Sequence, residues 1–308
     1  MSRTAISSTS DSMSERVVAH RVTIILTLGL VAISFASILI KICEAPPLII
    51  AAYRLTLATL VLLLSTLPGT VRELRRLGRA EILPSLLSGV FLCFHFAFWV
   101  TSLKYTSVAS SVIFVTTNPI FIALASFFLL GERLSYALFF SILLAVAGGL
   151  IIAWGDLGKG SGSLYGDFLA LLGAIMASAY LLSGRRVRPR MSLSAYITLA
   201  YGVAACLLIL LALLHGDDFF HYPPRTFLLF LLLALVPQLI GHTSLNWALK
   251  YFTATLVAVF ILGEPIGATI LAYLLLGESL TANLLLGGAM VLLGIFLSAR
   301  EERKLGER

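Results

Sequence analysis

Long apolar runs separated by short polar connections dominate the pattern of this chain. A run of about 20 apolar residues is long enough for a helix to cross the hydrocarbon core of a bilayer. The pattern therefore predicts an all-α integral membrane protein with ten transmembrane helices. We expect these helices at Val22–Lys41, Leu48–Leu67, Ile82–Leu103, Val108–Leu129, Ser135–Trp154, Leu164–Ser183, Leu193–Leu214, Thr226–Leu249, Ala254–Leu275 and Ala282–Ala299.

An internal repeat relates two of these runs. The tripeptide Leu-Lys-Tyr opens an apolar run at residues 103–105 and another at residues 249–251, 146 residues later. Pro119 lies at the middle of the first run and Pro265 at the middle of the second, and both runs end in Leu-Gly-Glu. Proline has no N–H and leaves the carbonyl four residues earlier without its helical partner, so we expect an interrupted helix in each copy. Such repeats are typical of secondary transporters.

The amino-acid composition agrees with an integral membrane protein. Of the 308 residues, 59% are hydrophobic and 12% are charged, and the mean hydropathy is +1.00, whereas soluble domains carry about 25% charged residues. Cys43, Cys93 and Cys206 are scattered and have no paired spacing. This spacing argues against a disulfide framework, a metal site or a redox motif, and we expect no cofactor.

The basic residues set the expected orientation, because cytoplasmic connections of membrane proteins are enriched in Lys and Arg. We expect both termini in the cytoplasm, with residues 1–21 as a disordered tail and residues 300–308 as a second tail. The net charge of +7 then reflects topology and attraction to the inner leaflet, and no nucleic-acid partner is expected. In this orientation the outside connections hold only Lys41, Lys104, Lys159 and Arg225 among the basic residues.

The two halves of the chain, residues 22–154 and 164–299, are expected to form inverted repeats of five helices each. Five spans separate the two proline-containing runs, and an odd number inserts the copies in opposite directions. The first copy then ends on the cytoplasmic side, at Gly131-Glu132, and the second ends outside, at Gly277-Glu278. We interpret Glu132 and Glu278 as structural residues that close short loops and pair with nearby basic groups.

Several motifs in the two halves match a known family. They are Ala52-Tyr53-Arg54, Pro119 followed by Gly131-Glu132-Arg133-Leu134, Glu264-Pro265 followed by Gly277-Glu278-Ser279-Leu280, and Gly148 and Gly294 late in the fifth and tenth spans. On these residues the chain resembles the EamA branch of the drug/metabolite transporter superfamily. The resemblance implies a central cavity lined by spans 1, 3, 4, 6, 8 and 9, a place in the cell inner membrane, and export of small metabolites such as aromatic amino acids. The first span lacks the carboxylate that single-repeat multidrug relatives use, so their mechanism is not carried over.

Two charged residues inside predicted spans are candidates for chemistry. A carboxylate such as Glu264 costs about 2.5–3.5 kcal/mol at the centre of a membrane helix, so it should face a cavity or a partner. Glu264 either binds a coupling proton or a substrate amine, or caps backbone groups freed by Pro265. Arg54 either holds a substrate carboxylate through its planar fork, or pairs with backbone carbonyls or with a carboxylate such as Glu44.

Polar and aromatic residues on the third and eighth spans, which are equivalent in the two halves, complete the candidate site. Such groups facing each other suit a substrate with a ring or a positive charge. Each residue alone also fits helix packing or interhelical hydrogen bonding. The candidates are His95 and Trp99 on the third span, His242, Asn246 and Trp247 on the eighth, and Asn118, Tyr180 and Tyr201 as weaker members.

The sequence as a whole predicts a carrier, not an enzyme. We expect it to export amino acids or related small metabolites by alternating access, with the two halves rocking around Asn118 and Glu264 and with protons as a candidate coupling ion. An uncoupled facilitator or channel and a multidrug exporter of the same fold remain as alternatives. The sequence leaves the oligomeric state open.

Overall fold

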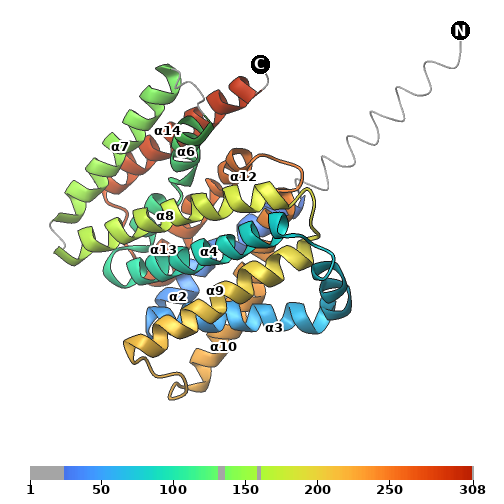
Figure 1. The fold of residues 1–308 in the computed structure, drawn as a ribbon. Coiled ribbons are helices and arrows are strands. Elements are labelled where there is room, and N and C mark those ends of the chain that lie inside the picture. Colours follow the sequence, from blue (N-terminus) through green and yellow to red (C-terminus); the bar gives the residue numbers. More distant parts are fainter. Residues whose placement is uncertain (1–23, 131–135, 158–160, 307–308) are drawn as a thin grey trace, which may run out of the picture.

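The computed structural model describes residues 24–130, 136–157 and 161–306, and within these ranges it is helical and has no strand (Figure 1). The starts predicted for the first and fifth spans, Val22 and Ser135, lie outside the described residues. The first span, Ile24–Lys41, ends in α2. The helices in chain order are α2 (Ala36–Lys41), α3 (Pro47–Leu74), α4 (Arg79–Tyr105), α5 (Val108–Val115), α6 (Asn118–Leu130), α7 (Tyr136–Leu157), α8 (Ser161–Val187), α9 (Leu193–His215), α10 (Pro224–Leu233), the π-helix η1 (Ala234–His242), α11 (Thr243–Ala248), α12 (Ala254–Ile261), α13 (Gly263–Leu276) and α14 (Ala282–Gly306).

Seven helical segments in the described ranges are long and apolar enough to cross a membrane. Three shorter apolar segments, Phe139–Gly155, Gly263–Leu276 and Ala282–Leu297, overlap the fifth, ninth and tenth predicted spans. The all-helical membrane fold is therefore confirmed, whereas the count of ten spans stays a prediction. α14 continues as a helix to Gly306, into the stretch expected as the C-terminal tail.

The fourth and ninth spans are both interrupted where the sequence predicted a break. Residues 116–117 separate α5 from α6, and Leu262 separates α12 from α13. Pro119 and Pro265 then fall in the first turns of α6 and α13, where the missing N–H leaves no helical hydrogen bond unmade. Each proline therefore follows a break that it helps to define.

The eighth span departs from a regular helix in a way that the sequence analysis missed. Between α10 and α11 the chain forms the π-helix η1, with Pro237 inside it. A proline at this position removes a donor from the α-helical pattern, and π-helical turns are one way in which a helix absorbs such a defect. Gln238, the residue that follows, is fully buried.

Helices α7 and α14 pack along each other at one side of the molecule (Figure 1). A Cβ on Gly148 would lie 2.5 Å from the carbonyl oxygen of Gly287, and one on Gly294 would lie 2.6 Å from the carbonyl oxygen of Ser141. Gly294 and Gly287 lie 146 residues after Gly148 and Ser141 respectively, so these two contacts are equivalent under the repeat. The glycines allow the two helices to approach closely.

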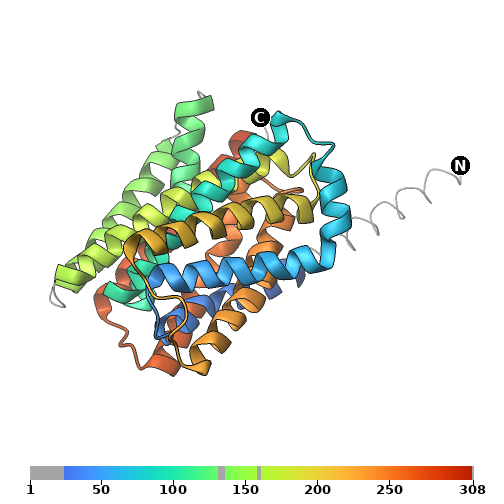
Figure 2. The same ribbon diagram turned by 60° about the horizontal axis from the view of Figure 1, so that its bottom comes forward.

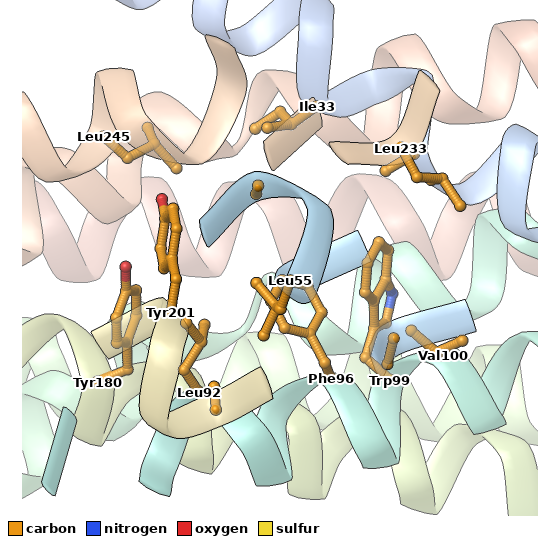
Figure 3. Packing of buried hydrophobic residues seen from close by; sticks show 14 of the residues in the cluster. Ile33, Leu55, Leu92, Phe96, Trp99, Val100, Tyr180, Tyr201, Leu233 and Leu245 are labelled. Carbon is orange, nitrogen blue, oxygen red and sulfur yellow. The ribbon is translucent and has the colours of Figure 1, made fainter. Parts of the chain in front are cut away.

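The main core lies on the other side of the molecule. There α3 packs along α9, and α4 packs along α8 and α9 (Figure 2). Leu55, Phe96, Val100 and Tyr201 are all fully buried in this core (Figure 3). α4 lies between α8 and α9. It also carries His95 and Trp99, which border the central cavity.

Candidate functional site

A central cavity lies between the two halves, with room of about 50 Å³ for the centres of water molecules. A single buried water needs about 10–15 Å³ by this measure, so the space suits a few waters. The lining comes from six spans, the first, third, fourth, sixth, eighth and ninth, which are the spans that the family resemblance implies. The lining residues are Ile33, His95, Trp99, Val115, Thr116, Asn118, Ala177, Tyr180, Leu181, His242, Leu245, Ile261 and Glu264.

The break in the fourth span places polar groups at this cavity. The hydroxyl of Thr116 donates to the carbonyl of Val112 at 2.8 Å, and that of Thr117 donates to the carbonyl of Phe114 at 2.7 Å. The Asn118 side-chain oxygen is buried and has no hydrogen-bond partner among the described residues. Asn118 therefore borders the cavity with an acceptor that is free for a ligand or water.

Glu264 lies at the equivalent break in the ninth span. It is the second residue of α13, lines the cavity and is 8% exposed. Within the described part of the chain its carboxyl group makes no hydrogen bond or ion pair, and α13 has no side-chain cap at its N-terminus. The capping role considered for Glu264 is therefore not observed. A carboxylate at this end of a helix is favoured by the helix dipole.

Two imidazoles and an indole form the aromatic part of the cavity wall. The ring of His95 lies parallel to Trp99 at 6.0 Å and is 6.4 Å from His242. His95 Nδ1 lies 3.0 Å from the carbonyl oxygen of Gly173. Because a carbonyl only accepts, Nδ1 carries the proton and Nε2 of a neutral ring remains an acceptor. The third and eighth spans thus face each other, as expected.

A hydrogen-bonded chain lies beside the cavity. The Tyr180 hydroxyl, on the wall itself, donates to the side-chain oxygen of Asn246 at 2.7 Å. The Asn246 amide donates to the Tyr201 hydroxyl at 3.1 Å, and in Figure 3 the hydroxyls of Tyr180 and Tyr201 point the same way. Asn246 and Tyr201 do not line the cavity. Trp247 lies away from it and packs on Tyr251, with ring centroids 5.0 Å apart.

Arg54 lies behind the aromatic wall and is fully buried. Its Nε donates to the side-chain oxygen of Gln238 at 2.8 Å, and its guanidinium carbon lies 4.4 Å from the centre of the Phe96 ring. The pairing with Glu44 considered for Arg54 is not present, since Glu44 is exposed and makes no contact with it. Sequence analysis missed Gln238, although a Gln beside Pro237 within an apolar span was a visible signal.

Two stretches of the chain, residues 21–154 and 164–300, match one protein family, described as EamA-like transporters. The chain belongs to the EamA-like transporter family. It is similar to an uncharacterized transporter of Archaeoglobus fulgidus, at 26% identity over 291 residues that cover 91% of this chain and 96% of that protein. It is also similar to the uncharacterized transporter YdfC of Bacillus subtilis, at 25% identity over 285 residues that cover 92% and 91%.

A solved crystal structure also resembles the EamA-family protein described here. It matches with a TM-score of 0.66 at 20% identity and covers 93% of this chain and 99% of that one, which supports the fold. Together with its apolar helices, the family identifies this protein as a multi-pass membrane transporter with a small-molecule substrate.

One end of this EamA-family protein is held by polar contacts that sequence analysis largely missed. Both carboxylate oxygens of Glu278 accept from the backbone N–H of Val108, at 3.1 and 2.9 Å, and so cap α5. Lys41 Nζ donates to the carbonyls of Leu103 and Thr106 at 2.7 and 2.8 Å. Glu278 is structural in this contact, but it caps a helix far away in the chain and does not close its own loop as the sequence predicted. Its counterpart Glu132 lies outside the described residues.

Proposed function

We propose that this EamA-family transporter is a secondary carrier that exports amino acids or related small metabolites across the cell inner membrane by alternating access. The observation that carries the proposal is the cavity between two interrupted helices, where Asn118 and Glu264 occupy equivalent positions 146 residues apart. Paired discontinuous helices at the interface of two repeats are the usual location of a transporter's substrate and coupling-ion sites.

In this mechanism the two halves rock around the cavity, and Glu264 carries the coupling proton. A buried carboxylate without a partner is more stable protonated, whereas it ionises when water enters the cavity. A change of access would therefore change its protonation. The absence of a hydrogen bond to Glu264 in the described residues supports this role over a capping role.

We place both termini in the cytoplasm, because the basic clusters then fall on the inside. A cytoplasmic reporter fused after Arg308 should be active, and the same reporter inserted at Asp217, between α9 and α10, should be inactive. A periplasmic reporter should give the opposite pair of results. Activity of the periplasmic reporter after Arg308 would exclude this orientation.

Two alternatives share the same fold. An uncoupled facilitator or channel would use the same cavity without Glu264 as a proton carrier, and a multidrug exporter would accept amphiphilic cations on the aromatic wall. A carrier saturates and shows counterflow of labelled substrate, whereas a channel shows neither.

The deciding experiment is uptake into everted membrane vesicles, with and without a proton gradient, against a panel of amino acids and amphiphilic cations. We expect saturable, gradient-dependent accumulation of one or more amino acids. Accumulation of the cations alone would favour the multidrug alternative. Non-saturable movement that never exceeds equilibrium would favour the channel.

A further inference from the structure

Four buried N–H-bearing groups beside the cavity have no acceptor among the described residues. They are the two terminal amino groups of Arg54, the side-chain amide nitrogen of Gln238 and the indole nitrogen of Trp99. Buried polar groups in proteins nearly always have a hydrogen-bond partner, so a cluster of unpartnered donors calls for one.

These donors belong to one cluster. Arg54 and Gln238 are joined by the 2.8 Å hydrogen bond, and the guanidinium carbon of Arg54 lies 6.0 Å from the Trp99 ring. Trp99 also lines the cavity, whereas Arg54 and Gln238 lie behind it. The cluster therefore adjoins the cavity through Trp99.

The free polar groups of the cluster are all hydrogen-bond donors. Arg54 Nε can only donate, so the oxygen of the Gln238 amide must face it. The NH2 group of that amide then lies near the Tyr201 hydroxyl and makes no hydrogen bond of ordinary geometry. Arginine and the indole have no acceptor atom either. A buried guanidinium is costly unless its donors are paired, and Glu264, the carboxylate on the cavity wall, is close enough to interact with the charge of Arg54 but makes no hydrogen bond to it. The complement of this cluster is a small group that carries negative charge and only acceptors.

We infer that Arg54, Gln238 and Trp99 form a subsite for the carboxylate group of the transported substrate, an inference that rests on the function proposed above. A carboxylate matches the planar fork of arginine through two parallel hydrogen bonds. The aromatic wall of His95, Trp99 and His242 then takes the apolar part of the same molecule. The substrates are carboxylic acids, amino acids among them, and not the corresponding amines.

The positions that the repeat relates to Arg54 and Trp99 do not carry donors of this kind. The residue 146 positions after Arg54 is Ala200, and the residue equivalent to Trp99 is Leu245. The fold is therefore nearly symmetric, whereas the donors are not. A substrate bound through its carboxylate has one orientation in the cavity.

Matched pairs that differ only in the carboxylate test this subsite. The pairs are alanine and ethylamine, leucine and 3-methylbutylamine, and phenylalanine and phenethylamine. Binding to purified protein is measured by calorimetry, and uptake is measured in proteoliposomes. We expect at least one amino acid to bind and to be transported at least tenfold better than its amine.

Three variants test the roles of the cluster. Arg54→Gln should remove the tenfold preference, and Arg54→Lys should restore only part of it, because lysine keeps the charge without the fork. Gln238→Glu should also remove the tenfold preference, because the new carboxylate would pair with Arg54 in place of the substrate carboxylate. Arg188→Lys is the matched control, since Arg188 is also buried but donates to the backbone carbonyls of Asn246 and Met191. This control should lower the melting temperature and leave the preference unchanged.

The outcomes separate this inference from the function on which it rests. Arg54-dependent binding of amino acids without uptake would overturn the transporter proposal and keep the subsite. Uptake of amines as fast as amino acids, or an unchanged preference in folded Arg54→Gln protein, would overturn the subsite and leave its donors to bound water. Arg54-dependent binding of chloride without binding of any amino acid would assign the cluster to a resident inorganic ion, and would also overturn it.

Discussion

The two interrupted spans share one geometry and differ in chemistry. At the first break, Thr116 and Thr117 donate their hydroxyls to backbone carbonyls, and Asn118 follows. At the second break the chain reads Leu262-Gly263-Glu264 and has no hydroxyl. A Cβ on Gly263 would lie 2.4 Å from the side chain of Leu30, so the glycine allows the first span to pack against this break. The repeat fixes where the helices break, whereas the individual residues decide what each break can bind.

The same contrast extends to neighbouring spans. The third span is one regular helix, α4, whereas the eighth contains the π-helix η1 with Pro237 and Gln238. The positions equivalent to these two residues are Phe91 and Leu92. One half thus supplies Arg54 and most of the aromatic wall, and the other supplies Gln238 and the carboxylate of Glu264. Equivalent substitutions in the two halves should therefore differ most in their effects at the cavity and least in the peripheral helices α7 and α14.

The largest effect is expected at the carboxylate. Glu264→Gln keeps the shape of the side chain but cannot ionise, so accumulation against a gradient should fall to equilibrium while substrate binding is retained. Asn118→Asp changes the equivalent position and keeps Glu264, so some accumulation against the gradient should remain. Both are measured as proton-driven uptake in proteoliposomes, with binding to purified protein as the control for folding. Uptake by Glu264→Gln at the normal rate would exclude a coupling role.

The peripheral helices α7 and α14 should lose similar amounts of stability when their equivalent glycines are replaced by alanine. Gly148→Ala places a Cβ 2.5 Å from a backbone oxygen, and Gly294→Ala places one 2.6 Å from another. Overpacking of this kind costs about 1–3 kcal/mol, and we expect similar losses from both, measured as melting temperature in detergent. Gly69→Ala is the control, because no atom lies within 4 Å of the new Cβ and alanine favours a helix by about 0.8–1 kcal/mol. Opposite shifts for Gly148 and Gly294 would contradict the symmetric packing.

A smaller effect is expected in the hydrogen-bonded chain beside the cavity. Tyr180→Phe removes the 2.7 Å bond to Asn246, and a neutral hydrogen bond contributes about 0.5–1.5 kcal/mol. The melting temperature should fall slightly, and the affinity for substrate should weaken because Tyr180 lines the cavity. Tyr201→Phe should lower stability with less effect on affinity, since Tyr201 does not reach the cavity. Equal loss of affinity in the two variants would contradict this distinction.

The smallest effect is expected at the first break. Thr116→Val keeps the shape of the side chain and removes its hydrogen bond to the carbonyl of Val112. Because that carbonyl also accepts from the backbone N–H of Thr116 at 3.1 Å, we expect a loss of at most about 1 kcal/mol. A melting curve in detergent is sufficient to measure it. A loss of several kcal/mol would show that the hydroxyl holds the break open.

The sequence predicted the parts of this protein that follow from periodicity and repetition. The two breaks and the facing of His95 and His242 follow from apolar length, proline position and the repeat. The π-helix did not, because Pro237 signals a defect without specifying how the helix absorbs it. Nor did the pairing of Arg54 with Gln238 or the capping of α5 by Glu278, because these partners lie far apart in the chain.

If the cavity between the two breaks is the transport site, cysteines placed on its wall should be reached by water-soluble thiol reagents and protected by substrate. Thr116→Cys and Ala177→Cys place small thiols on the wall, and Val146→Cys, at a position on α7 that is 52% exposed, faces the bilayer as the control. A Cys206→Ser background removes the exposed native thiol. The other two native thiols are buried, and burial raises the pKa of Cys43 to about 11, which keeps it unreactive.

The measurement is the rate at which a charged, water-soluble thiol reagent modifies each variant, with and without the amino acid that is transported best. We predict modification at both wall positions, protection by that substrate, and no modification at Val146→Cys. Wall thiols that stay unmodified, or that react at the same rate with saturating substrate, would show that the cavity is not the transport site.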